Sequence, residues 1–272
     1  MRLLQAVAAV LAAASIGSVA LAQTAQSIPD VSPEAPAVSQ AGAREVSTGD
    51  ADEDAVLATV ADVQAHGIVA VKDHEAALRK VVGDMPQPFV RERQEGGVMT
   101  YRADSAEGCL AETARLRAVA GQASVDLVCR GNPYPTAAFY LGSYFNETDQ
   151  PNAAIEVLKL GLVAAPDSPL LLTERNAAFN ALHHWDDTLS GADRGLAIAN
   201  LLPRDRARLL RNRGYALTEL RRLDDAQQAY EASLQLEPDS ALAKNELAYI
   251  ARLKNGGTAA ATKIFMPYRQ PP

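Results

Sequence analysis

Residues 207–240 constrain the fold more than any other part of the chain. Apolar and small residues recur there at steps of three and four, as along one face of an amphipathic helix: Leu209, Leu210, Gly214, Leu217, Leu220, Ala226, Tyr230 and Leu234. The pattern breaks at residues 221–225 and stops at Pro238, so two helices joined by a tight turn fill 34 residues. Such a unit cannot bury its apolar face alone, and further copies are therefore expected nearby.

Two copies precede this stretch. Residues 135–168 repeat its pattern with Leu141, Gly142, Phe145, Ala154, Leu158, Gly161 and Pro166. Residues 169–202 form a weaker copy, in which Asn176, Thr188 and Asn200 replace the Gly, Ala and Pro of the pattern. Residues 203–206 are inserted before the third copy, and residues 241–254 predict a single helix that caps the array.

The three copies resemble the tetratricopeptide repeat, whose signature places a Gly and a Tyr in the first helix and then Ala, an aromatic residue and Pro. The resemblance covers about 120 residues, 135–255 with the cap. It implies an α-solenoid of three helix-turn-helix repeats plus a capping helix. With the small α/β region that precedes the repeats, the chain as a whole is expected to be mainly α. Members of this family usually bind peptides or partner proteins on the concave face that the first helices form.

The start of the chain predicts export. Arg2 precedes an apolar run, and Ala20 and Ala22 supply small residues before Gln23, so residues 1–22 are interpreted as a cleaved signal peptide. No second apolar span follows, and we expect no membrane insertion after cleavage. Residues 23–52 are rich in Ala, Ser, Pro, Gln and Asp, which predicts a disordered linker. These features favour a periplasmic or secreted protein of the bacterial cell envelope.

Residues 53–134 predict the small α/β region. Apolar periodicity predicts one helix that ends near residue 66 and another over 73–83. Strands are predicted at 98–102 and 125–129, with a helix over 105–120 between them. This order favours a parallel pair of strands. Residues 256–272 form a tail.

Sequence signals for catalysis are few. The chain has no GxSxG or HExxH motif and no phosphate-binding Gly-rich loop. His183 and His184 are adjacent, so on a helix they point about 100° apart and do not converge on one metal ion. The formal net charge of −7 argues against nucleic acid as a partner. We therefore predict no catalytic residue, metal or cofactor. One alternative stays open, in which the α/β region is an enzyme or small-molecule domain and the repeats position its substrate.

The resemblance supplies candidate partner-binding residues. Matched one position at a time, the concave face carries Phe139, Ser143, Asn146, Thr173, Ala177, Asn180, Arg208, Arg211 and Tyr215. The best-known variant of the family grips a C-terminal carboxylate with Lys, Asn and Arg. The matching positions here are Phe139, Ser143, Glu174, Arg208 and Asn212. Only Arg208 has the required charge, so that particular clamp is not supported.

Arginines gather in one stretch of this acidic chain. Seven lie within residues 204–222: Arg204, Arg206, Arg208, Arg211, Arg213, Arg221 and Arg222. They form either a solvated face that pairs with Asp205 and Glu219 or a site for an anion or carboxylate. The second interpretation favours a protein or peptide partner that is acidic or presents a free C-terminus.

Cys109 and Cys129 are the two cysteines of the chain. In an oxidising compartment such a pair is more often a disulfide than two free thiols, so we predict a Cys109–Cys129 bond. It would close a loop of about 20 residues and contribute roughly 3 kcal/mol by restricting the unfolded chain. Thiol counting of non-reduced, denatured protein should find no free thiol, whereas two free thiols would exclude the bond.

Overall fold

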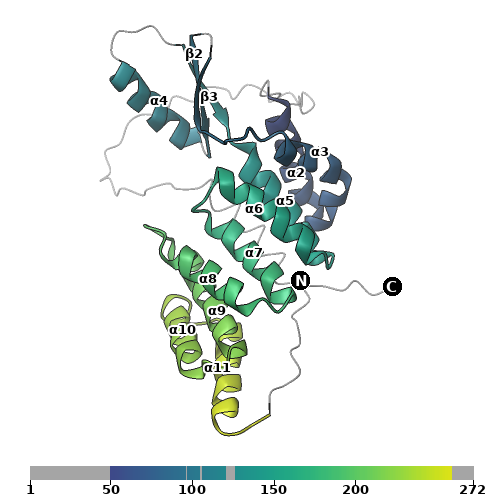
Figure 1. Cartoon of the computed structure of the whole chain (residues 1–272), viewed down its shortest axis with the longest axis vertical. Helices are drawn as coiled ribbons and strands as arrows, with labels where there is room; N and C mark the ends of the chain where they lie inside the picture. Colours follow the sequence, from purple (N-terminus) through teal and green to yellow (C-terminus); the bar gives the residue numbers. More distant parts are fainter. Residues whose placement is uncertain (1–49, 96, 105, 121–125, 259–272) are drawn as a thin grey trace, which may run out of the picture.

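The structure is a computed structural model that describes residues 50–95, 97–104, 106–120 and 126–258. Helices dominate these residues, and a small sheet interrupts them once (Figure 1). The predicted signal peptide, residues 23–49 of the predicted linker and most of the predicted tail lie outside the described residues.

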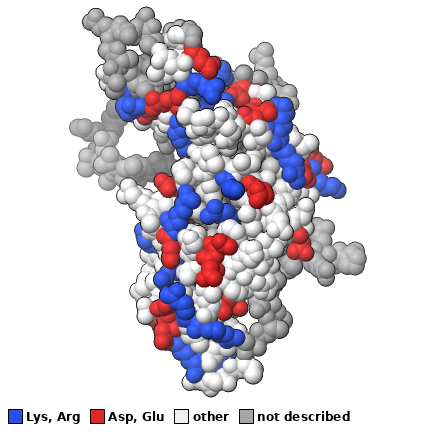
Figure 2. All heavy atoms as spheres, in the orientation of Figure 1, with Lys and Arg blue, Asp and Glu red and all other residues white. Residues whose placement is uncertain are grey.

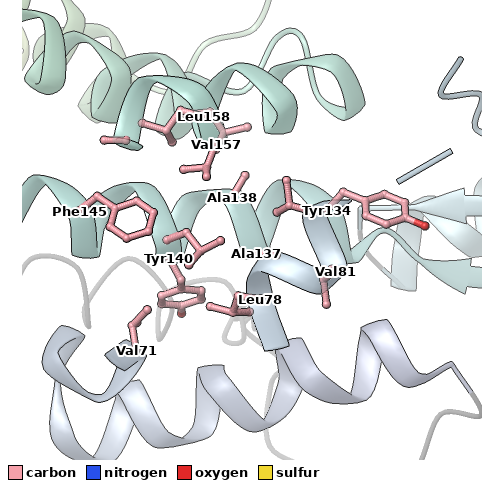
Figure 3. Close-up of a cluster of buried hydrophobic side chains, with 14 of the residues drawn as sticks. Val71, Leu78, Val81, Tyr134, Ala137, Ala138, Tyr140, Phe145, Val157 and Leu158 are labelled. Carbon is pink, nitrogen blue, oxygen red and sulfur yellow. The ribbon is translucent and has the colours of Figure 1, made fainter. Parts of the chain in front are cut away.

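A pair of helices opens the described chain. They are α2 (Ala51–His66) and α3 (Val71–Gly83), joined by the short 3₁₀ turn η2 (Ile68–Ala70). Gly67 ends α2 with φ 83°, a left-handed conformation that glycine adopts without strain. Val71 and Leu78 of α3 are fully buried and lie against Tyr140 of the first repeat (Figure 3). Residues 51–83 therefore extend the helical layer, although the sequence had grouped 53–83 with the strands.

The sheet has three strands in the order β1-β2-β3: β1 (Glu92–Glu95), β2 (Val98–Ala103) and β3 (Asp126–Gly131). β2 and β3 are parallel, with Val98 opposite Asp126, and α4 (Ala106–Ala120) connects them, as the sequence predicts. β1 pairs antiparallel with β2 and was not predicted. Its four residues are all exposed and carry no alternation of apolar and polar side chains. A disulfide joins Cys109 on α4 to Cys129 on β3, with Cα atoms 5.9 Å apart.

Three helix pairs and a final helix follow the sheet. They are α5 (Pro133–Glu147) with α6 (Pro151–Ala164), α7 (Pro169–Ala181) with α8 (Trp185–Leu196), α9 (Pro203–Glu219) with α10 (Leu223–Leu236), and α11 (Ala241–Lys254). The insertion 203–206 forms the first turn of α9, where Pro203 suits the first helical position because it has no N–H to leave unpaired. The prediction of a mainly α solenoid of helix-turn-helix repeats with a small sheet region is confirmed.

The turn within each pair has the same backbone conformation. Asp149, His183 and Arg221 have φ of 59°, 60° and 62°. In each turn the next amide donates to a carbonyl five residues before it: Gln150 to Phe145, His184 to Phe179 and Arg222 to Leu217, at 2.8–2.9 Å. These are Schellman-type helix ends, which usually use glycine at the left-handed residue. Because none of the three residues is glycine, this shared turn could not be predicted from the sequence.

Glycines set the spacing within the first and third pairs. A Cβ added at Gly142 would lie 2.5 Å from Leu158 Cγ, and one at Gly214 would lie 2.7 Å from Tyr230 Cε2. Each glycine thus faces the second helix of its own repeat at close range, as the sequence predicts. The middle repeat reverses the arrangement, since Asn176 lies on α7 and the close glycine is Gly191 on α8.

We expect Gly214→Leu to destabilise the protein by about 1–3 kcal/mol, because the new side chain overlaps the Tyr230 ring in a fully buried site. Gly214→Ala should also lower the unfolding midpoint, since crowding opposes its gain in helix propensity. Gly83→Ala is the matched control, because no atom lies within 4 Å of its added Cβ. Thermal unfolding measures all three variants. An unchanged midpoint for Gly214→Leu would contradict the helix pairing.

Candidate functional site: the first-helix face

The candidate site is the face formed by the first helices of the pairs, α5, α7 and α9, which we call the first-helix face. α5 packs against α7, and α7 packs against α9, so the predicted partner-binding residues come from adjacent helices. The face is therefore a continuous surface across the three repeats.

A polar cluster crosses the face at its centre. Asn146 of α5 donates from Nδ2 to the Glu174 backbone carbonyl (3.0 Å) and to Glu174 Oε2 (3.2 Å) on α7. Burial raises the pKa of Glu174, although the Asn146 donor and the positive charge of Arg208 on α9 oppose this shift. A weaker opposing effect comes from the Ser143 hydroxyl, which lies near the carboxylate outside strict hydrogen-bonding geometry. The cluster thus brings together three predicted residues, Ser143, Asn146 and Arg208, around one carboxylate.

Several buried polar atoms on this face have no partner among the described residues. They are Ser143 Oγ and Asn146 Oδ1 on α5 and Asn212 Nδ2 on α9. A buried polar atom left unpaired costs about 1–3 kcal/mol, so a polar ligand that reaches these atoms recovers that free energy. Asn212 was noted in the sequence only as a clamp position, and nothing there indicated that its amide would be unpaired.

Glu147 adds a second carboxyl group to the same region. Burial, together with the nearby charge of Glu174, raises the pKa of Glu147 to about 7. This carboxyl group therefore titrates near neutral pH. Glu147 could not be identified from the sequence, because its interaction with Glu174 exists only once α5 and α7 lie side by side.

Arg211 and Tyr215 mark the far end of the face. Arg211 is 17% exposed and donates from Nη1 to Glu237 Oε2 at 2.5 Å, so its charge is already paired within its own repeat. Tyr215 packs edge-on against Trp185, with ring centroids 5.8 Å apart. Burial raises the pKa of Tyr215 to about 12, so its phenol is neutral at physiological pH. Tyr215 and Trp185 together form an aromatic wall.

The remaining predicted partner-binding residues differ in how far their side chains are exposed and free to contact a partner. Ala177 is exposed and Thr173 is half-buried, both on α7. Phe139 packs edge-on against Tyr140, with centroids 5.4 Å apart. Asn180 Oδ1 accepts a hydrogen bond from Thr188 Oγ1 at 2.8 Å, so this amide is engaged with α8 of its own repeat.

The arginines of residues 204–222 do not act as one patch. Arg213 pairs with Asp193 at 2.8 Å and Arg222 with Asp225 at 2.7 Å, while Arg204 lies 4.0 Å from Asp205. Figure 2 shows basic and acidic side chains interleaved over the surface in this view. Within the described residues, Arg208 has no ion pair closer than 4 Å, and among the arginines without one it is the cation whose charge acts on Glu174.

In the described part of the chain, no group of three or more His, Cys, Asp or Glu side chains converges as a metal site would require. His183 packs on Trp185 and His184 stacks on Phe179, so the adjacent histidines have separate environments. Among residues 50–95, 97–104, 106–120 and 126–258, we find no helix that is both long enough and apolar enough to cross a bilayer.

Known proteins give partial matches. No protein-family model matches the chain. It is similar to RNA polymerase II-associated protein 3 of mouse (35% identity over 147 residues, 53% of this chain and 20% of that protein). The human protein of the same name is 32% identical over 134 residues, covering 49% of this chain and 18% of that protein. The chain thus spans about a fifth of the length of these relatives.

Two solved structures show partial likeness. One is the first TPR of Spaghetti (RPAP3) bound to the HSP90 peptide SRMEEVD, with 26% identity, a TM-score of 0.42, and coverage of 45% of this chain and 94% of that chain. The other is the second TPR domain of human RPAP3 in complex with the HSP70 peptide SGPTIEEVD, with 24% identity, a TM-score of 0.39, and coverage of 43% and 98%.

The predicted periplasmic or secreted location is wrong. The curated relatives come from mouse, rat, human and Xenopus laevis and are named for association with RNA polymerase II, so they are not bacterial envelope proteins. That prediction rested on residues 1–22, which lie outside the described residues. This segment is not part of the solenoid, and the apolar packing of the solenoid does not specify a compartment.

The raised pKa of Glu147 predicts how stability depends on pH. Its folded-state pKa of about 7 lies above the ordinary 4.5, so the folded chain holds this proton more tightly than the unfolded chain. Stability therefore falls as pH rises from about 4.5 to about 7, and Glu147→Gln removes this dependence. We expect the variant to melt higher than the parent at about pH 8 and to lose that advantage at about pH 4.5.

Glu156→Gln is the control for this comparison, because Glu156 is an exposed glutamate on α6. Its melting curve should follow that of the parent at both pH values. If the melting temperature of Glu147→Gln also followed that of the parent at both pH values, the result would contradict the proposed interaction between the Glu147 and Glu174 carboxyl groups on the first-helix face.

Proposed function

We propose that this chain is a non-enzymatic protein–protein interaction scaffold whose first-helix face binds an extended segment of a partner protein or peptide. One observation carries the proposal: around the Glu174–Arg208 centre, buried polar atoms on α5 and α9 have no hydrogen-bond partner among the described residues. An extended peptide presents one N–H and one C=O per residue and can satisfy such atoms along its length. The Tyr215–Trp185 wall supplies apolar contact at one end.

The partner segment presents a carboxylate to Arg208. A guanidinium offers planar paired donors that suit a carboxylate, and Arg208 faces Glu174 without a close ion pair in the described residues. An incoming carboxylate would take over as the counter-ion of Arg208. The solved RPAP3 domains bind HSP90 and HSP70 peptides that end in EEVD, a class of acidic C-terminal ligand. In this chain Glu147 and Glu174 repel a run of acids, so we propose one carboxylate, a single acidic side chain or the C-terminus itself.

A random-sequence peptide library tests the proposal when it is prepared in two forms, with free C-terminal carboxylates and with C-terminal amides. We expect immobilised protein to enrich the free-carboxylate form. Arg208→Ala should abolish that preference. Glu174→Gln should tighten binding of the enriched peptides about two- to five-fold, because it removes the charge that competes for Arg208.

Arg213→Ala is the matched control, since Arg213 lies on the same helix but pairs with Asp193 on α8. It should bind like the parent. Equal losses for Arg208→Ala and Arg213→Ala, or equal enrichment of acid and amide peptides, would contradict a carboxylate site. Enrichment of no peptide in either form would contradict the scaffold function.

A further inference from the structure

A cavity of about 470 Å³, lined by both polar and apolar atoms, lies where the sheet region meets the first two repeats. Its lining comes from three separate parts of the chain. Arg91 precedes β1 and Asp104 follows β2, Asn132 and Thr136 lie at the start of α5, and residues 165–168 connect α6 to α7. The cavity is distinct from the first-helix face, because none of the partner-binding residues proposed there lines it.

The one cation of the lining, Arg91, already makes three hydrogen bonds within the protein. Arg91 donates from Nη2 to Asp104 Oδ2 at 2.7 Å and to the Ala164 carbonyl at 3.2 Å. Its Nη1 donates to the Arg102 carbonyl at 3.3 Å. These bonds tie the sheet region to the end of α6. They use three of the five N–H donors of the guanidinium and pair its charge with Asp104, which lowers its attraction for an anion from solution.

Asn132 provides a buried acceptor that has no partner in the part of the chain that the structure describes. Its Nδ2 donates to Asp104 Oδ1 at 2.8 Å, which fixes the orientation of the amide, because an ionised carboxylate can only accept. The residue is 7% exposed, and its Oδ1 has no hydrogen-bond partner in the described residues. Asn132 is the N-cap of α5, where this oxygen would normally accept from the third helical residue. That residue is Pro135, which has no N–H.

The charge of the lining favours a cation. Asp104 and Asp167 outnumber Arg91, and the exposed Asp167 has no ion pair in the part of the chain that the structure describes. The Thr136 hydroxyl can also accept, and the Ser168 hydroxyl, which already accepts from the Leu171 amide at 3.4 Å, has a second lone pair. A metal ion is a poorer match, since among the described residues no three His, Cys, Asp or Glu side chains converge. The lining of this cavity therefore favours a ligand that is a positively charged hydrogen-bond donor.

We propose that the cavity binds a primary ammonium group, with Asn132 Oδ1 and the Asp167 carboxylate as its acceptors. An ammonium group offers three donors and a single positive charge, which matches a lining rich in acceptors. The group belongs either to a free amine or to a lysine side chain of a partner protein. This site gives the sheet region a binding role of its own, independent of the first-helix face.

NMR titration of the full chain tests the site with two ammonium probes, ethanolamine and Nα-acetyl-lysine methylamide. The amide signals of Thr136 and Ser168 should shift with both probes. The Nε-acetylated form of the lysine derivative, which lacks the charge, should leave them in place. Tighter binding of ethanolamine would assign the site to free amines, and tighter binding of the lysine derivative would assign it to a partner lysine.

Asp167→Asn and Thr136→Val should each weaken the ammonium probes about two- to five-fold. Asp149→Asn is the control, because Asp149 is an exposed aspartate away from the cavity and asparagine tolerates its φ of 59°. The proposal is overturned if the acetylated probe shifts the same signals equally, if sodium acetate shifts them instead, or if no probe shifts them. None of these outcomes depends on whether the first-helix face binds peptides.

Discussion

The structure depends on the close approach of paired helices at residues that have no side chain. Gly142 lets Leu158 reach the backbone of α5, and Gly214 does the same for the ring of Tyr230 against α9. Gly195 extends this contact between repeats, since an added Cβ there would lie 2.7 Å from Leu209 Cδ2. Because these contacts fix how each first helix sits on its second helix, they also fix the spacing of Ser143, Glu174 and Arg208 across the first-helix face.

The middle repeat shows how this constraint can be met in another way. Asn176 occupies the usual glycine position and is fully buried, and neither of its side-chain polar atoms has a hydrogen-bond partner in the described residues. The space comes from Gly191 on the opposite helix. Thr188 replaces the usual alanine and satisfies its hydroxyl through Asn180. The sequence therefore predicted that this repeat is a weak copy. It could not show that the close glycine lies on the second helix instead of the first, because that becomes visible only when the two helices are paired.

The sequence predicts features that depend on neighbouring residues better than features that depend on contacts between distant residues. Apolar periodicity predicted the helices of 51–83, but their packing on Tyr140 is a tertiary contact that periodicity cannot assign. Position matching indicated Ser143, Asn146 and Arg208, which do cluster. It could not show that Arg211 pairs with Glu237, 26 residues further along the chain. The carboxyl pair of Glu147 and Glu174 and the cavity beside Asn132 likewise arise only when separate segments meet.

Site-specific photo-crosslinking tests the central claim, that the first-helix face is the binding surface, most directly. A photo-crosslinking amino acid is placed at Ala177 on α7 or at Ala232 on α10, both of which are exposed. Each protein is then irradiated with the free-carboxylate peptide library. The account predicts abundant peptide adducts at position 177 and few at position 232. Equal crosslinking at the two positions, or a preference for position 232, would contradict it.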